Sequence, residues 1–205
     1  MCIFSGPIFL GFIQSPKGIY AMMHPFYCQP EYQHLPFPPE MTQAQRDETG
    51  AVICASSMMI EDLLNLCFPP EECFRFASGC GLSDCAGVNF PVFCGALAGR
   101  FCLQLTVMND VKQGLKALCG DEARRLLLPL RRESPEDGKP SLRHTVLISG
   151  KEGDYFHMLD PMFRPGRSNR HVRRKRLHLA GDRTLVPGDV LAEEYAGQPL
   201  FLFSR

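Results

Sequence analysis

The sequence lacks the patterns that would assign its cysteines to a zinc site or a disulfide framework. Ten cysteines occur among 205 residues, but no two of them are separated by just two residues, the spacing that structural zinc sites commonly use. The opening stretch, MCIFSGPIFLGFIQS, has no charged n-region of a secretory signal peptide and is too short to span a bilayer. These absences predict a reducing compartment, in which most cysteines act as small buried hydrophobic residues.

Other signatures are also missing. The chain has no glycine-rich ATP-binding loop, no internal repeat and no low-complexity tract. Its length and its 45% hydrophobic content are enough to bury a core, and they favour one domain with an extension. We expect residues 1–39 to form an N-terminal extension packed on a domain of residues 40–205. We also expect a cytoplasmic protein, or one delivered elsewhere without a cleavable signal peptide.

The formal net charge is zero, but the charges are unevenly distributed. Between Glu31 and Glu72 the only basic residue is Arg46, among eight acids, whereas Arg164 to Arg176 holds seven basic residues and no acid. Such a basic run is suited to an acidic partner or to nucleic acid. No aromatic residues for base stacking are interleaved with it, so a solvated loop and edge strand is the favoured interpretation over nucleic-acid binding.

Helical patterns come first along the chain. Residues 20–44 are rich in proline and aromatics and favour an extended segment laid over a core. A helix is predicted from Cys54 to about Cys67, a second one follows the Pro69-Pro70 pair, and a third covers about Phe90 to Arg100.

Short β-type runs dominate the later half. CLQLTVMN predicts a strand, and the next segment, VKQGLKALCG, predicts a helix capped by Asn109 or Asp110. The runs RRLLLPL, RHTVLISG, DYFHMLDP, VRRKRLHLA and PLFLFS predict strands, with SGKEGD as a hairpin turn. A helical N-terminal half packed on an antiparallel sheet from the C-terminal half makes an α+β fold.

One cysteine and two distant polar residues suggest a nucleophilic site. A thiol becomes a nucleophile when a helix N-terminus or a neighbouring imidazolium stabilises its thiolate. Cys54 is predicted to begin a helix, and His144 begins the strand HTVLISG. Asp160 ends the next strand across the hairpin, so it and His144 are expected at the same end of the sheet, where Asp160 would orient the imidazole.

The motifs QRDE, CASSMMI, HTVLISG and YFHMLDPM together resemble the papain-like cysteine peptidases of the bacteriocin-processing, or double-glycine, type. The resemblance spans roughly residues 40 to 165 and implies a papain-like fold and bacterial relatives. It implies Cys54 as nucleophile, His144 as general base and then acid, Asp160 as its orienting group and Gln45 as the oxyanion-hole side chain. The sequence departs from the family pattern where Ala55-Ser56 replaces the usual Gly-Pro, and Gln43 is the alternative to Gln45.

Rival residues and functions remain open. His157 lies three residues from Asp160 on one strand and so on the opposite face, where we interpret it as structural. Cys80 and Cys85, in GCGLSDCAG, are the main competitors of Cys54 as a nucleophile. The predicted function is an enzyme, a thiol peptidase that acts on a peptide or isopeptide-like bond by hydrolysis or transfer. The alternatives are a catalytically inactive peptide- or protein-binding module of the same fold and a cysteine-rich metal or redox protein. The first two need no cofactor, no metal and no membrane.

Overall fold

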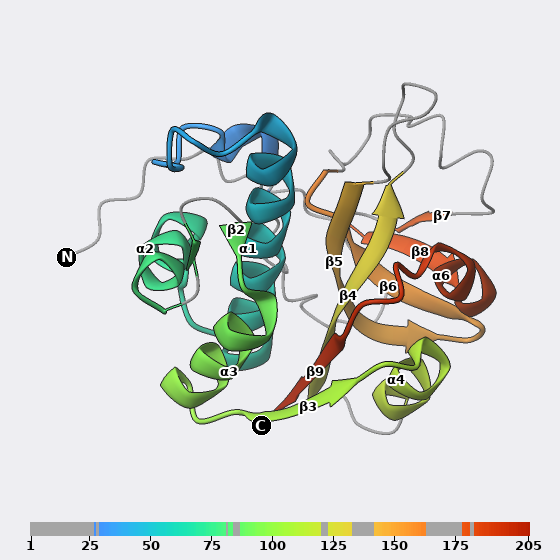
Figure 1. Ribbon diagram of the computed structural model, residues 1–205. Coiled ribbons are helices and arrows are strands. Elements are labelled where there is room, and N and C mark those ends of the chain that lie inside the picture. Colours follow the sequence, from blue (N-terminus) through green and yellow to red (C-terminus); the bar gives the residue numbers. More distant parts are fainter. Residues whose placement is uncertain are drawn as a thin grey trace.

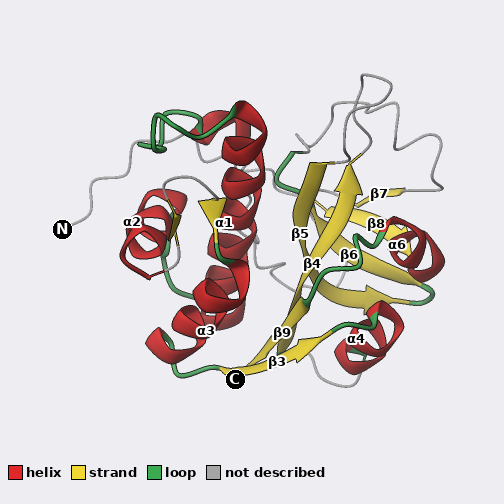
Figure 2. Ribbon diagram, in the orientation of Figure 1, coloured by secondary structure: helices red, strands yellow, loops and turns green. Residues whose placement is uncertain are grey.

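The computed structural model describes residues 27, 29–80, 82–83, 87–119, 123–132, 142–162, 178–180 and 183–205. Helices come first along the chain and an antiparallel sheet is assembled mainly from later strands, so the mixed helix-and-sheet prediction is confirmed (Figures 1 and 2). Residues 1–26 of the predicted extension and the basic run Arg164 to Arg176 lie outside the described residues. An acidic partner for that run therefore stays a prediction.

The central helix α1 spans Gln43–Leu64 and begins eleven residues before Cys54. Thr42 is its N-cap: the Thr42 hydroxyl accepts the N–H of Gln45, and the Gln45 side chain accepts the N–H of Thr42 in return. This reciprocal capping box satisfies two backbone donors that a helix start leaves unpaired. The helix ends at Asn65, which adopts a left-handed conformation with φ of 53°. Because residues 49–61 are buried throughout, α1 forms the middle of the molecule rather than its surface.

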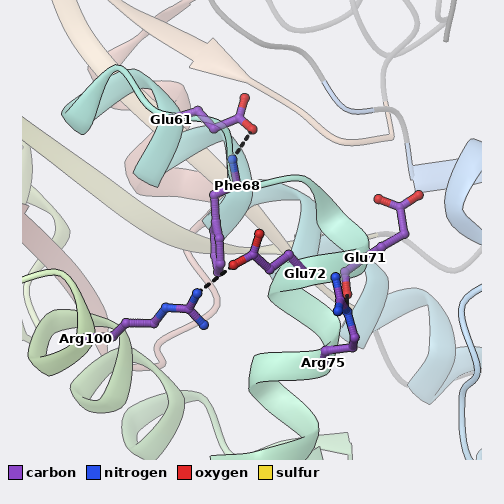
Figure 3. A network of polar contacts seen from close by, with 6 residues as sticks. All are labelled: Glu61, Phe68, Glu71, Glu72, Arg75 and Arg100. Atoms are coloured by element: carbon purple, nitrogen blue, oxygen red, sulfur yellow. Dashed lines mark hydrogen bonds and ion pairs between the residues drawn. The ribbon is translucent and has the colours of Figure 1, made fainter. Parts of the chain in front are cut away.

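Two further helices flank α1. α2 spans Pro70–Cys80, with Glu71 and Glu72 in its first turn, and α3 spans Phe90–Arg100. Arg100 joins them, since its guanidinium donates to the Glu72 carboxylate at 2.6 Å and lies over the ring of Phe68 (Figure 3). The two-residue strands β1, Leu82–Ser83, and β2, Gly87–Val88, pair with each other between these helices in the sequence.

A segment that we call the N-terminal strap, residue 27 with residues 29–42, lies across α1 and includes the 3-10 helix η1, Gln29–Tyr32. The Tyr27 hydroxyl donates to the buried Glu61 carboxylate at 2.7 Å. Arg46 of α1 donates to two strap carbonyls, those of Met41 at 3.2 Å and Pro39 at 3.3 Å. These contacts hold the strap against the side of α1 opposite to the sheet.

Apart from β1 and β2, the described strands form one antiparallel sheet of seven strands in the order β3-β9-β4-β5-β6-β8-β7. Their bounds are β3 Gln104–Met108, β4 Arg124–Arg132, β5 Leu142–Glu152, β6 Tyr155–Leu159, β7 His178–Ala180, β8 Arg183–Pro187 and β9 Leu200–Ser204. The β5–β6 pair is the hairpin predicted from SGKEGD, and its turn places Gly153 at a φ of 58°. The last strand along the chain, β9, pairs with both β3 and β4, so it is an interior strand next to the edge strand β3.

Side chains alternate along these strands and build a separate core on each face of the sheet. The face toward α1 carries Leu127, Leu147, Leu159, Phe201 and Phe203, which pack with the helical half. The other face carries the alternate residues of the same strands and packs under α4, Val111–Leu118, and α6, Gly188–Glu194 (Figure 1). The helical half therefore docks on one face only, and any cleft between helices and sheet must open beside α1.

The sequence analysis did not anticipate α6. This helix has seven residues, and its N-cap, Pro187, has no side chain that can accept a hydrogen bond from the first turn. Val190 and Leu191 bury themselves against the sheet. Packing of those two residues, rather than a local start signal, stabilises α6.

Candidate functional site

His144 and Asp160, the two polar residues predicted to meet at one end of the sheet, are in contact. Nε2 of His144 and Oδ1 of Asp160 are 2.5 Å apart, and the same Oδ1 accepts the backbone N–H of Met162 at 2.8 Å. The side chains expose 9% and 24% of their surface, so the pair is shielded from water without being sealed. A carboxylate in this position holds the imidazole ring in one orientation.

Cys54 does not occupy the position that the sequence predicted. The prediction that it begins a helix is wrong, because α1 begins at Gln43 and runs on beyond Cys54. The Cys54 side chain is completely buried. A thiol three turns into a helix does not face the unpaired N–H groups of the first turn, so the helix terminus gives its thiolate little stabilisation.

Helix periodicity shows which way Cys54 points. At 3.6 residues per turn, Cys54 projects about 180° from Gln45 and about 140° from Thr49. Gly50, one turn before Cys54, lines a crevice of about 180 Å³ together with Tyr32 of the strap. Burial raises the pKa of the Tyr32 phenol, the Glu71 carboxylate raises it further, and a smaller effect from Cys54 indicates that Cys54 lies near Tyr32. Cys54 therefore faces the strap and not the sheet.

A cleft of about 220 Å³ lies on the opposite side of α1, between this helix and the ends of β4, β5 and β9. Thr49 of α1 and Thr145 of β5 both contribute to it, and each is only 2% exposed. Thr145 directly follows His144 in the chain, which ties the cleft to the same end of the sheet. The described residues that line it are Gln45, Glu48, Thr49, Val52, Gly87, Val88, Asn89, Phe90, Pro91, Pro129, Thr145, Gln198, Pro199 and Phe201.

The two glutamines considered for the oxyanion hole lie on different sides of α1. Gln45 lines the cleft, and its side-chain oxygen accepts both the N–H of Thr42 at 2.8 Å and the Thr42 hydroxyl at 2.9 Å. Gln43 lines the crevice beside the strap and donates to Asp47 at 2.9 Å. The structure therefore brings His144 to Asp160 but directs Gln45 and Cys54 to opposite sides of one helix.

The rival residues have identifiable surroundings where the structure describes them. The Cys80 thiol lies 3.1 Å from the carbonyl oxygen of Phe76, one turn earlier in α2, and Cys85 lies outside the described residues. His157 contacts Glu152 through Nε2 at 3.3 Å. Within the described part of the chain, no group of three or more His, Cys, Asp and Glu side chains is arranged to hold a metal ion.

Sequence reasoning missed the residues that shape the cleft. Thr49 and Glu48 precede the apolar part of α1 and are residue types common near a helix start. Thr145 is a residue type common in strands, so none of the three is distinctive in the sequence. The capping box Thr42-x-x-Gln45 is a recognisable signal in the sequence, and it would have placed the start of α1 correctly. With that start known, helix periodicity would have put Gln45, Thr49 and Val52 on one face.

Comparison with solved structures shows a likeness in fold. No family model and no curated protein matches the chain. Among solved structures, a crystal structure from Bacillus anthracis, provisionally described as a C39-like peptidase, superimposes with a TM-score of 0.50 at 9% sequence identity. The likeness covers 89% of this chain and 94% of that one. At 9% identity the likeness shows a similar fold and assigns no role to any individual residue.

Hydropathy adds one finding about the helices. Among the described residues, none of the helices is both long enough and apolar enough to cross a membrane.

Proposed function

We propose that this chain is a catalytically inactive, papain-like module that holds a peptide or an extended protein segment in the cleft beside α1. The observation that carries the proposal is the position of Cys54, completely buried on the side of α1 away from the cleft. The cleft surface is instead formed by hydroxyl, amide and apolar side chains. Such a surface can satisfy a peptide backbone by hydrogen bonds and accept apolar side chains. Among the described residues that line it, none has a thiol to attack a carbonyl.

A second candidate function is favoured by a different observation, the contact between His144 and Asp160. A histidine held by a carboxylate is the base half of a thiol peptidase site, and the likeness to a C39-like fold supports the same function. In this candidate Cys54 is the nucleophile, Gln45 supplies an oxyanion donor, and cleavage proceeds by hydrolysis or transfer. It requires a rearrangement that brings the Cys54 thiol to His144.

One experiment separates these candidates. Degenerate pools of blocked hexapeptides are incubated with the full chain, and retained and cleaved peptides are identified by ultrafiltration and mass spectrometry. For the binding module we expect retention without cleavage. Gln198→Trp, which places a large ring at the partly exposed rim of the cleft, should abolish retention.

The control is Gln113→Trp, at an exposed position of α4 on the other face of the sheet, which should bind like the unmodified chain. Cleaved peptides that disappear with Cys54→Ala would overturn the binding-module proposal in favour of the peptidase. Retention that Gln198→Trp leaves intact would place the binding surface elsewhere and also overturn it.

A further inference from the structure

Strand β3 forms one edge of the seven-stranded sheet. Among the described strands it pairs with β9 alone, through five consecutive residue pairs (Figure 1). Thr106 and Val107 lie in the middle of β3 and project to opposite faces of the sheet. Both side chains are exposed, that of Val107 by 54%. The helices that pack on the sheet therefore leave both faces open at the middle of this edge.

The sequence of β3 lacks the features that protect an edge strand from pairing with another chain. Natural edge strands are commonly protected by charged side chains, by proline, by a bulge or by short length. The five residues of β3, QLTVM, include no charged residue and no proline. By contrast, β7, at the opposite edge of the described sheet, has only three residues. Of these two edges, β3 is therefore the one better suited to accept a further strand.

We propose that a second copy of this chain pairs its own β3 with this strand, antiparallel and about a twofold axis at Thr106. Residues that face each other in an antiparallel pair lie on the same face of the sheet. An axis at Thr106 meets this condition and places Leu105 opposite the partner's Val107, and Thr106 opposite the partner's Thr106. The threonine pair can share a hydrogen bond, and the aliphatic pair removes part of Val107 from water.

Charge and contact size both bear on the choice of a second copy as the partner. The formal net charge of the chain is zero, so two copies approach each other without net repulsion. A strand of five residues is only about 17 Å long, so its pairing buries less than the roughly 1,200 Å² of a stable interface. We therefore expect a weak, reversible dimer whose population rises with protein concentration.

The test is sedimentation velocity of the full chain over about a hundredfold range of concentration. A reducing buffer prevents the exposed Cys102, two residues before β3, from cross-linking two copies. Thr106→Lys and Thr106→Glu should each weaken dimerisation by about tenfold or more, because each places like charges opposite each other at the axis. An equimolar mixture of the two variants should dimerise again, because a lysine then faces a glutamate.

The matched control is Gln33→Lys, at an exposed position of the strap on the far side of α1 from the sheet. It adds the same charge as Thr106→Lys and should dimerise like the unmodified chain. Monomers at every concentration would overturn the proposal. Dimers that Thr106→Lys leaves intact would place the contact on another surface and overturn it as well. A mixture of the two Thr106 variants that stayed monomeric would overturn the twofold pairing.

Discussion

Gln45 and Cys54 lie nine residues apart on α1 and project from opposite sides of it, about 180° apart by helix periodicity. Gln45 faces the cleft against the sheet, and Cys54 faces the strap. A thiol and an oxyanion donor that act on one carbonyl must lie on the same side of the backbone that holds them. The opposite directions of Gln45 and Cys54, more than the burial of Cys54 alone, prevent the thiol from acting on a ligand in the cleft.

Thiol reactivity provides the first prediction. In the native protein, iodoacetamide should label the exposed cysteines Cys67, Cys102 and Cys119 first, and Cys54 roughly tenfold or more slowly, because Cys54 reacts only when the strap or α1 opens. Burial raises the pKa of the Cys73 thiol to about 12, so Cys73 should also be slow. Mass-spectrometric mapping of each cysteine against time gives these rates.

His144→Ala is the informative variant for this prediction. We expect the labelling rate of Cys54 to stay unchanged, because His144 is held by Asp160 and does not activate a thiol that faces the strap. Rapid labelling of Cys54 that slows in His144→Ala would show a thiolate–imidazolium pair. That outcome would favour the peptidase candidate.

Much of the fold was predictable because its elements carry local signals. The helix over Phe90–Arg100 has an asparagine cap and an early proline, and the strands have the short β-type runs that turn residues separate. The start of α1 was predicted three turns too late because the prediction followed the apolar run after Cys54, whereas the helix begins at the capping box of Thr42. The short helix α6 had no cap of its own and depends on tertiary packing.

The candidate site was less predictable than the fold. The contact between His144 and Asp160 follows from two adjacent strands with a known turn, so counting along a hairpin was sufficient. Placing Cys54 required knowing that α1 begins at Gln43, because only then do Gln45 and Cys54 belong to one helix on which their directions can be compared. The cleft joins α1 to residues 87–91 and to three strands of the large sheet that are distant in sequence, and no local sequence pattern predicts such a junction.

The link between the helical half and the sheet gives the second prediction. Arg125 of β4 donates to the Asp62 carboxylate of α1, and the two side chains expose only 11% and 2% of their surface. Asp62→Ala should lower the free energy of unfolding by about 3–5 kcal/mol, because it leaves a guanidinium buried without its carboxylate. Urea denaturation measures the loss. The double variant Asp62→Leu with Arg125→Met should be less destabilised than Asp62→Ala, and an equal or greater loss would contradict this account.

A buried carboxylate under the strap gives the third prediction, which concerns pH. Glu61 accepts the Phe68 N–H at 2.6 Å (Figure 3) and the Tyr27 hydroxyl at 2.7 Å. Burial raises the pKa of Glu61 above its ordinary value of 4.5, against the lowering effect of these hydrogen bonds. A raised pKa means that the folded protein binds the Glu61 proton more tightly than the unfolded chain does, so protonation stabilises the fold. This stabilisation is complete below pH 4.5 and is lost as pH rises through the pKa of Glu61 in the folded protein.

Comparison with Glu61→Gln isolates that contribution, because glutamine keeps an acceptor oxygen and does not titrate. Urea unfolding of both proteins from pH 4 to 7 should show the unmodified chain losing stability relative to Glu61→Gln as pH rises. Tyr27→Phe, which removes one donor, should cost about 1 kcal/mol. If the unmodified chain instead became more stable than Glu61→Gln as pH rises, the pKa of Glu61 would be lowered by folding, and the prediction would be wrong.

The last prediction concerns the closure of the cleft wall by Gly87 and Thr49. Gly87 has a φ of 78°, and a Cβ added there would lie 2.9 Å from Oγ1 of Thr49. Gly87→Ala should therefore be destabilising for two separable reasons: the left-handed backbone costs roughly 1–2 kcal/mol, and the clash with the threonine adds to it. Thr49→Ala in the Gly87→Ala background should recover the part due to the clash. Thr49→Ser keeps the hydroxyl oxygen, so it should recover less stability than Thr49→Ala. If both substitutions recovered the same stability, the Thr49 oxygen would not be the reason that glycine is needed at position 87.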